Sequence, residues 1–237
     1  MSLRRRSLAN KLYKTIIDVD APDYITYGLV FLLDGKMNTV GGHTTNTKKW
    51  VDLSGNGYDA VLDGTYEWYD NALHLEQRGG CVLLSALPDM NTPFTVEYVY
   101  TYYASSGYGR LISFAGDHYS FQSGPQVGRA YFGGTVFSID TDDFSTFNAT
   151  RSYTGTVDTN KACAFYRNGV FKVRGTAAND YQPAITANSA IGRYAATDTP
   201  NLNITIDVHS LRLYNRVLSD SEIQTNYEKD KIRYGLS

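Results

Sequence analysis

Several residue types that build chemical sites are scarce in this chain of 237 residues, and each scarcity excludes a class of protein. Its two cysteines, Cys81 and Cys163, form no CxxC pair, so we expect neither a disulfide framework nor a zinc site. The interpretation favoured for both is a buried free thiol, although their spacing does not decide whether they pair. No apolar run approaches transmembrane length, and no apolar segment follows the basic N-terminus, so we expect neither membrane insertion nor a signal peptide.

Strong charge of either sign is also missing. The formal net charge is -2, which gives no electrostatic reason to expect nucleic acid as a partner. The exception is the N-terminus, where Arg4, Arg5, Arg6, Lys11 and Lys14 occur with no acidic residue before Asp18. We expect residues 1–23 to form a basic N-terminal arm and linker, either frayed in solvent or docked on a partner.

Tyrosine is abundant, with 20 copies, and the remainder of the chain alternates short apolar stretches with turn residues. Between residues 94 and 103, Phe94, Val96, Tyr98, Tyr100 and Tyr102 share one face of a predicted strand. We expect further strands at 27–33, 58–62, 66–69, 72–75, 81–84, 110–115, 119–122, 128–132, 152–157, 162–167, 170–173 and 204–214. The pattern predicts an all-β domain over residues 24–237.

Two local signals are sharper than the rest. Asn168-Gly169 separates two apolar stretches and predicts a hairpin, because a two-residue turn needs positive φ at both positions. Ser219 followed by Glu222 is a capping box, which predicts one helix from there to about Arg233, with Gly235 ending it.

The motifs then resemble a known family. The segment W-V-D-L-S-G-N-G-Y-D at residues 50–59 is similar to a motif of laminin-G-like, concanavalin A-like domains. So are the strand at 28–34, the Asn168-Gly169 hairpin and the strand and helix at 209–223. The resemblance implies a concanavalin A-like jelly-roll β-sandwich with one short C-terminal helix and a basic N-terminal arm.

The chain ends also resemble virion-associated proteins of phages and prophages. The function expected on that basis is a non-catalytic structural or decoration protein of the phage particle with a lectin-like domain. It would contact other virion proteins through the arm, bind glycans on the host surface, and form a homo-oligomer. It would stay in the bacterial host cytoplasm before assembly. The alternatives are a glycoside hydrolase of the concanavalin A-like superfamily and a carbohydrate-binding protein of a bacterial cell surface.

Candidate sugar-binding residues are tyrosines and an acid that we place in loops or at strand ends, because sugars stack on aromatic rings and bond to carboxylates. They are Tyr103, Tyr108, Tyr119, Tyr131, Tyr194 and Asp198. No cofactor is expected to be required; the resemblance offers a structural calcium ion as the candidate metal, with oxygen ligands from Asp34, Asp52, Asn56 and Asp207. Asp52 and Asn56 equally fit a role in capping turn amides.

The spacing of the acidic residues does not predict catalysis. Most glycoside hydrolases need two carboxylates beside the scissile bond, and the resembled glucanases place them on one strand at close spacing. None of the five glutamates, Glu67, Glu76, Glu97, Glu222 and Glu228, lies in such a pattern. The expectation from the sequence is therefore a protein that is not an enzyme and has no catalytic residues.

Overall fold

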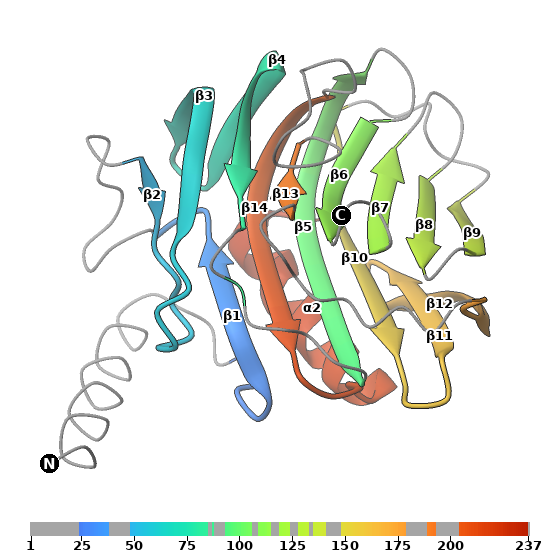
Figure 1. Ribbon diagram of the computed structural model, residues 1–237. Coiled ribbons are helices and arrows are strands. Elements are labelled where there is room, and N and C mark those ends of the chain that lie inside the picture. The colour runs from blue at the N-terminus through green and yellow to red at the C-terminus, as the bar shows by residue number, and fades with distance from the viewer. Residues whose placement is uncertain are drawn as a thin grey trace, which may run out of the picture.

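The computed structural model shows a curved all-β protein with one C-terminal helix, α2, on its outer side (Figure 1). Its β-strands belong to a single antiparallel 14-stranded sheet that curls on itself. The residues that the structure describes are 24–37, 48–84, 87, 93–105, 109–114, 119–123, 128–132, 135–140, 148–178, 189–192 and 204–236.

The elements follow one another along the chain with few long interruptions. The strands are β1 (Leu29–Asp34), β2 (Lys49–Trp50), β3 (Ala60–Tyr69), β4 (Ala72–Leu83), β5 (Phe94–Ser105), β6 (Gly109–Phe114), β7 (Tyr119–Ser123), β8 (Gly128–Phe132), β9 (Thr135–Asp140), β10 (Thr150–Val157), β11 (Ala162–Arg167), β12 (Val170–Thr176), β13 (Ala190–Ile191) and β14 (Ile204–Tyr214). The helix α2 spans Asp220–Tyr234.

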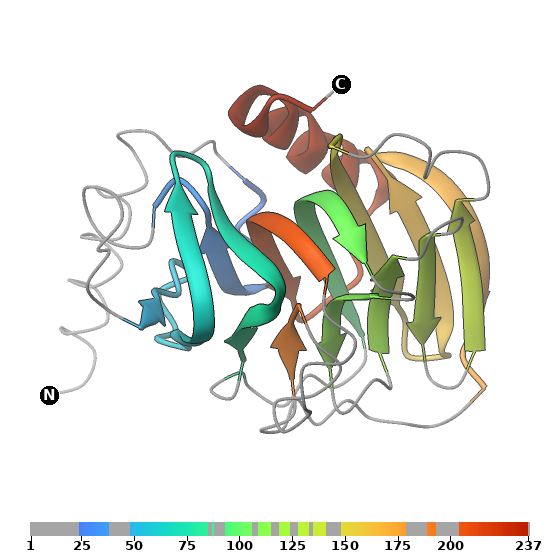
Figure 2. The same ribbon diagram turned by 90° about the horizontal axis from the view of Figure 1, so that it is seen from above.

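The spatial order of the main path is β12-β11-β10-β5-β14-β4-β13-β6-β7-β8-β9. The two ends of this path meet, because the Thr135 hydroxyl on β9 donates to the Thr176 carbonyl on β12 over 3.3 Å. The sheet is therefore a nearly closed barrel rather than two separate sheets. Seen from above, α2 lies outside the curve, against the layer that contains β14 and β5 (Figure 2).

The interior is filled by the apolar faces of the strands. Phe94, Val96, Tyr98, Tyr100 and Tyr102 on β5 are all buried, as the alternation in that segment predicts. Phenylalanines of the opposite layer pack against them and around Gly155, where an added Cβ would lie 2.9 Å from the Phe121 ring. The close packing of these rings therefore requires a glycine at position 155 of β10.

The outer face of the same layer carries a buried ionic network beneath α2. Arg212 on β14 donates to Glu97 on β5 over 2.8 Å and forms a bidentate pair with Asp230 on α2. Asn226 donates to the same Glu97 carboxylate over 2.8 Å, and Arg233 pairs with Asp34 on β1 at 2.7 Å. Charged groups this deeply buried need such partners, so the network fixes where the helix sits.

The two sharp local predictions are confirmed. Asn168 and Gly169 have φ of 49° and 71° between β11 and β12. Ser219 caps α2 with a complete capping box, and Gly235 ends it in the left-handed region at φ 70°. Two predicted breaks are wrong. Asp63 and Gly64 lie inside β3, where the register shifts between Gly64 and Tyr66, and the strands expected at 72–75 and 81–84 are one continuous strand, β4.

Candidate functional site

The candidate site lies on the outer face of four neighbouring strands, just beyond the C-terminal end of α2. We call it the aromatic–carboxylate cluster, and it consists of Tyr69, His74, Glu76, Tyr103 and Asp207. Strand register brings these residues together, since His74 on β4 is paired with Asp207 on β14. Alternation turns them outward, because the neighbours of Asp207 on β14, Ile206 and Val208, point into the core.

A chain of hydrogen bonds runs through the cluster. The Tyr103 hydroxyl donates to one Asp207 carboxylate oxygen over 2.6 Å, and His74 Nδ1 lies 2.6 Å from the other. His74 Nε2 lies 3.3 Å from the Glu76 carboxylate. The imidazole therefore stands between two carboxylates, one buried and one exposed.

Aromatic rings border this chain. The Tyr69 ring stacks on His74 with centroids 5.1 Å apart, and 41% of the Tyr69 surface is exposed. The Tyr103 ring meets the His74 ring edge-on at 6.1 Å. The exposed Tyr69 ring next to the exposed Glu76 carboxylate offers a stacking surface and a hydrogen-bond acceptor, which are the two kinds of contact that sugar binding needs.

Burial and charge perturb the titration of the cluster. Burial lowers the pKa of His74, but its hydrogen bonds to Asp207 and Glu76 outweigh that effect, so the pKa is raised overall. Burial and the bond to Asp207 raise the pKa of Tyr103 well above its usual value, which keeps its hydroxyl protonated. By contrast, burial lowers the pKa of the nearby His209, a strand residue that bonds to Thr101 and to the Asn71 carbonyl.

The sugar-binding residues predicted from the sequence meet this site at one position. Tyr103 belongs to the cluster, whereas Tyr131 is half-buried on β8, several strands away in the sheet. Tyr119 lies on β7, with its side chain outside the described residues. Tyr108, Tyr194 and Asp198 also lie outside the described residues. Sequence reasoning did not select Tyr69, His74 and Glu76, because no short-range spacing connects them to Asp207.

The predicted calcium ligands do not come together. Asp34 pairs with Arg233, and Asp207 belongs to the cluster. Asp52 accepts the Leu32, Ser54 and Tyr58 amides, and the Asn56 amide donates to the Val30 carbonyl, which is the turn-capping alternative. Within the described ranges, no three His, Cys, Asp or Glu side chains are grouped so that they could hold a metal ion.

Two other predictions concern the chain ends and the thiols. Arg4, Arg5, Arg6, Lys11 and Lys14 of the predicted arm lie outside the described residues. Cys163 is a buried free thiol, and burial raises its pKa to about 11. Among the described segments, no helix is long and apolar enough to cross a membrane.

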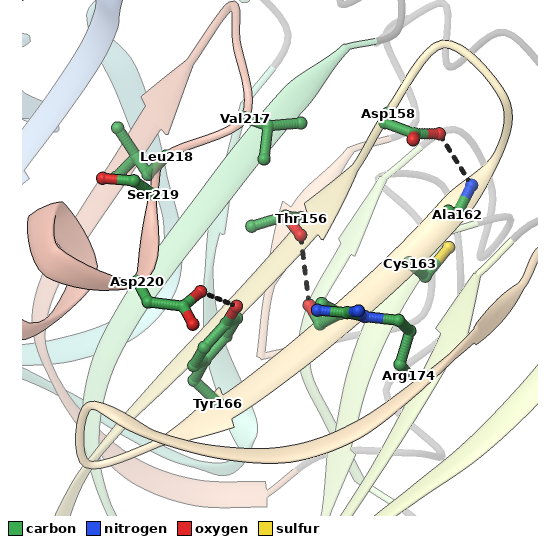
Figure 3. Close-up of a pocket in the computed structure, with 11 residues that line it drawn as sticks. Thr156, Asp158, Ala162, Cys163, Tyr166, Arg174, Val217, Leu218, Ser219 and Asp220 are labelled. Carbon is green, nitrogen blue, oxygen red and sulfur yellow. Dashed lines mark hydrogen bonds between the residues drawn. The ribbon is translucent and has the colours of Figure 1, made fainter.

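A second candidate is a cavity of about 510 Å³ beside the N-terminus of α2 (Figure 3). Residues of β10, β11 and β12 form one side, and the turn from Val217 to Asp220 forms the other. Across it, the Tyr166 hydroxyl donates to Asp220 over 2.6 Å. Like the cluster, this cavity combines apolar or aromatic groups with acidic side chains.

Comparison with known proteins gives a fold but no family. No protein-family model matches the chain, and no curated protein matches its sequence. Trypanosoma rangeli sialidase in complex with sialic acid is similar in structure, with a TM-score of 0.75, 18% identity and 98% of this chain covered. A mutant of that sialidase displaying trans-sialidase activity has a TM-score of 0.73 at 16% identity. In both cases the chain spans 39% of the sialidase's length.

Toxin domains are similar as well. The binding domain of Botulinum neurotoxin DC in complex with rat synaptotagmin II has a TM-score of 0.64 at 14% identity, over 86% of this chain and 52% of the toxin domain. At identities this low, the likeness shows a shared fold. It supports an all-β, lectin-like architecture for this chain.

These comparisons contradict two expectations from the sequence. The predicted non-catalytic decoration protein of a phage particle is wrong, because the similar structures named here are sialidases and a toxin binding domain, not virion proteins. The prediction that the chain is not an enzyme is contradicted by the same sialidases. The phage expectation rested on a resemblance of the chain ends, and the exclusion of catalysis rested on a search for paired acids along single strands.

Proposed function

We propose that this chain is a carbohydrate-active domain of the glycoside-hydrolase type, which recognises a glycan at the aromatic–carboxylate cluster. The fold similarity to sialidases over nearly the whole chain supports a role in glycan chemistry. We also propose that the nearly closed sheet is a variant of the concanavalin A-like, laminin-G-type jelly roll. The W-V-D-L-S-G-N-G-Y-D segment at residues 50–59 and the capped helix α2 support that assignment.

The observation that carries the proposal is the exposed Tyr69 ring stacked on His74, which Asp207 holds in place and which lies beside the exposed Glu76 carboxylate. A sugar ring presents apolar C–H groups on one face, which can stack on Tyr69. Its hydroxyls would then donate to Glu76, whose side chain is 61% exposed. The Asp207 carboxylate is buried and bonds both Tyr103 and His74, so it would hold these two rings in place when a sugar binds.

The same arrangement has the components of hydrolysis. Most glycoside hydrolases use two carboxyl groups, one as an acid and one as a base or nucleophile. Glu76 and Asp207 lie on opposite nitrogens of His74, so protonation of this histidine controls the charge between them. Activity of the chain on a glycoside would therefore depend on both acids and on the protonation of His74.

Binding is tested first, with the purified chain on an array of neutral, amino and sialylated glycans, followed by calorimetry on the best ligand. Tyr69→Ala should weaken binding about tenfold, because aromatic contacts of this kind contribute about 0.5–1.5 kcal/mol beyond their buried area. Tyr27→Ala is the matched control, since Tyr27 is 79% exposed and lies near Arg216, away from the cluster. Equal losses in the two variants, or no glycan bound at all, would refute the proposal.

Hydrolysis is tested separately, with chromogenic glycosides that include sialosides. If the cluster is catalytic, Glu76→Gln and Asp207→Asn should each remove turnover while Tyr27→Ala keeps it. Turnover that survives both substitutions would show that the cluster does not carry the chemistry. Binding without turnover would limit the cluster to recognition.

A further inference from the structure

The cavity beside the N-terminus of α2 is large enough for a small ligand, and none of its lining residues belongs to the aromatic–carboxylate cluster. We propose that it is a second sugar site, selective for a sugar ring that carries a primary ammonium group. This inference rests on the proposed function, since it takes glycan recognition as the role of the domain. Its volume of about 510 Å³ lies within the usual range for small-ligand pockets, and one sugar ring is smaller than that.

The sequence creates this space by placing small side chains on one strand. Ala162 and Ala164 lie on the outer face of β11, while Cys163 between them points into the core. Leu218, in the turn before α2, packs in the same cluster as Ala164, and with the two alanines it forms an apolar floor on which the C–H face of a sugar can rest. Thr156, Ser219 and Tyr166 add hydroxyl groups to the walls.

Two carboxylates stand at separate positions around the cavity, and both are held in place. One oxygen of Asp158 accepts the Asn160 and Ala162 amides, each over 2.8 Å. One oxygen of Asp220 accepts the Tyr166 hydroxyl. In each case these bonds hold the carboxylate through one oxygen. The second oxygen can then accept a hydrogen bond from a ligand without the entropic cost of ordering the side chain.

The cation in the lining does not cancel this charge. Arg174 lies 5.5 Å from the Phe171 ring, and its side chain extends from β12 among the residues that line the cavity (Figure 3). Burial and the Asp220 bond raise the pKa of Tyr166 to about 12, so this wall stays uncharged near neutral pH. Two acids against one arginine leave the lining with a net charge of about -1, which favours an ammonium ligand over an acidic sugar.

A pair of oligosaccharides tests the charge selection. The tetramers of glucosamine and of N-acetylglucosamine share a backbone, but the acetylated form has no ammonium group. Calorimetry at pH 6 and low salt should show at least tenfold tighter binding of the glucosamine tetramer. Asp220→Asn should reduce that preference at least fivefold, and Glu228→Gln, a charge change on the exposed side of the same helix, should leave it unchanged.

A second pair of variants tests the location. Ala162→Trp fills the cavity and should abolish binding of the glucosamine tetramer, whereas Val170→Trp, at an exposed site of β12 outside the lining, should not. Melting curves verify that each variant is folded.

The outcomes separate this inference from the proposed function. Equal affinity for the two tetramers, or a preference that Asp220→Asn leaves intact, overturns the cavity's assignment, even if Tyr69→Ala still weakens binding of another glycan. A preference lost with Tyr69→Ala and kept with Ala162→Trp overturns it too, since the ammonium would then bind at the cluster. If no glycan of any class binds, the proposed function fails with it.

Discussion

The ionic network beneath α2 makes a severe prediction for Arg212→Met. Arg212 is 1% exposed, and its guanidinium bonds both Glu97 and Asp230 while the Tyr24 ring covers it at 4.1 Å. Methionine keeps the length and apolar character of the stem but removes the charge. Two carboxylates then remain buried without their cation.

The magnitude follows from that imbalance. Removing one partner of a buried ion pair typically costs about 3–5 kcal/mol, because the remaining charge is desolvated and unpaired. For a domain of this size each kcal/mol lowers Tm by about 2–4 °C, so the melting temperature should fall by about 6–20 °C. Burial already raises the pKa of Glu97, and losing Arg212 raises it further.

The sign of the pH effect is therefore fixed. An acid whose pKa is raised in the folded state favours folding when protonated, so the penalty of Arg212→Met should shrink as pH falls from 7 towards 5. Urea unfolding at both pH values measures it, and the double variant Arg212→Met/Glu97→Gln should lose less stability than Arg212→Met alone. A loss below about 1 kcal/mol at pH 7, or a double variant worse than the single one, would refute the reasoning.

Three further predictions test local features. Ser219→Ala removes the cap of α2 and should cost about 0.5–2 kcal/mol in urea unfolding, while Ser221→Ala, two residues later, should cost little. Gly155→Ala places a methyl group 2.9 Å from the Phe121 ring and should cost about 1–3 kcal/mol, whereas no loss would mean that the ring shifts freely. His74 binds its proton more tightly when folded, so its contribution to stability is complete below its unfolded pKa and is lost as pH rises through the raised value. His74→Gln should flatten that part of the stability–pH curve, and an unchanged curve would count against the ion pairs of this histidine.

The sequence predicted three local features of the fold correctly. The alternation on β5, the Asn168-Gly169 turn and the capping box at Ser219 each depend on neighbours a few residues apart, and all three were correct. The two-residue strands β2 and β13 show no periodicity, so nothing predicted them. Separate strands were expected at 58–62 and 66–69, but Gly64 between them has positive φ inside β3, where the register shifts as at a bulge.

The site was less accessible to such rules. His74 and Asp207 are separated by 133 positions and touch because of strand register, which short-range patterns do not encode. Tyr103 was selected for its loop-edge position, and Asp207 for a metal that needs several oxygens in one place. The Tyr103 hydroxyl does donate to Asp207 over 2.6 Å. The two residues serve neither separate role, because they belong to one hydrogen-bonded chain in which His74 lies between Asp207 and Glu76.

The helix α2 connects the two candidate sites physically. Its N-terminal end supplies Ser219 and Asp220 to the cavity, and at its other end Tyr234 packs on His209, two residues from Asp207 of the cluster. Fifteen helical residues span about 22 Å, so Tyr69 and Asp220 variants should act independently, as distant sites do. Arg212 anchors the helix between them, so Arg212→Met should weaken binding at both sites at once. A loss at one site alone would show that the helix ends are held by their local contacts instead of by the buried ions.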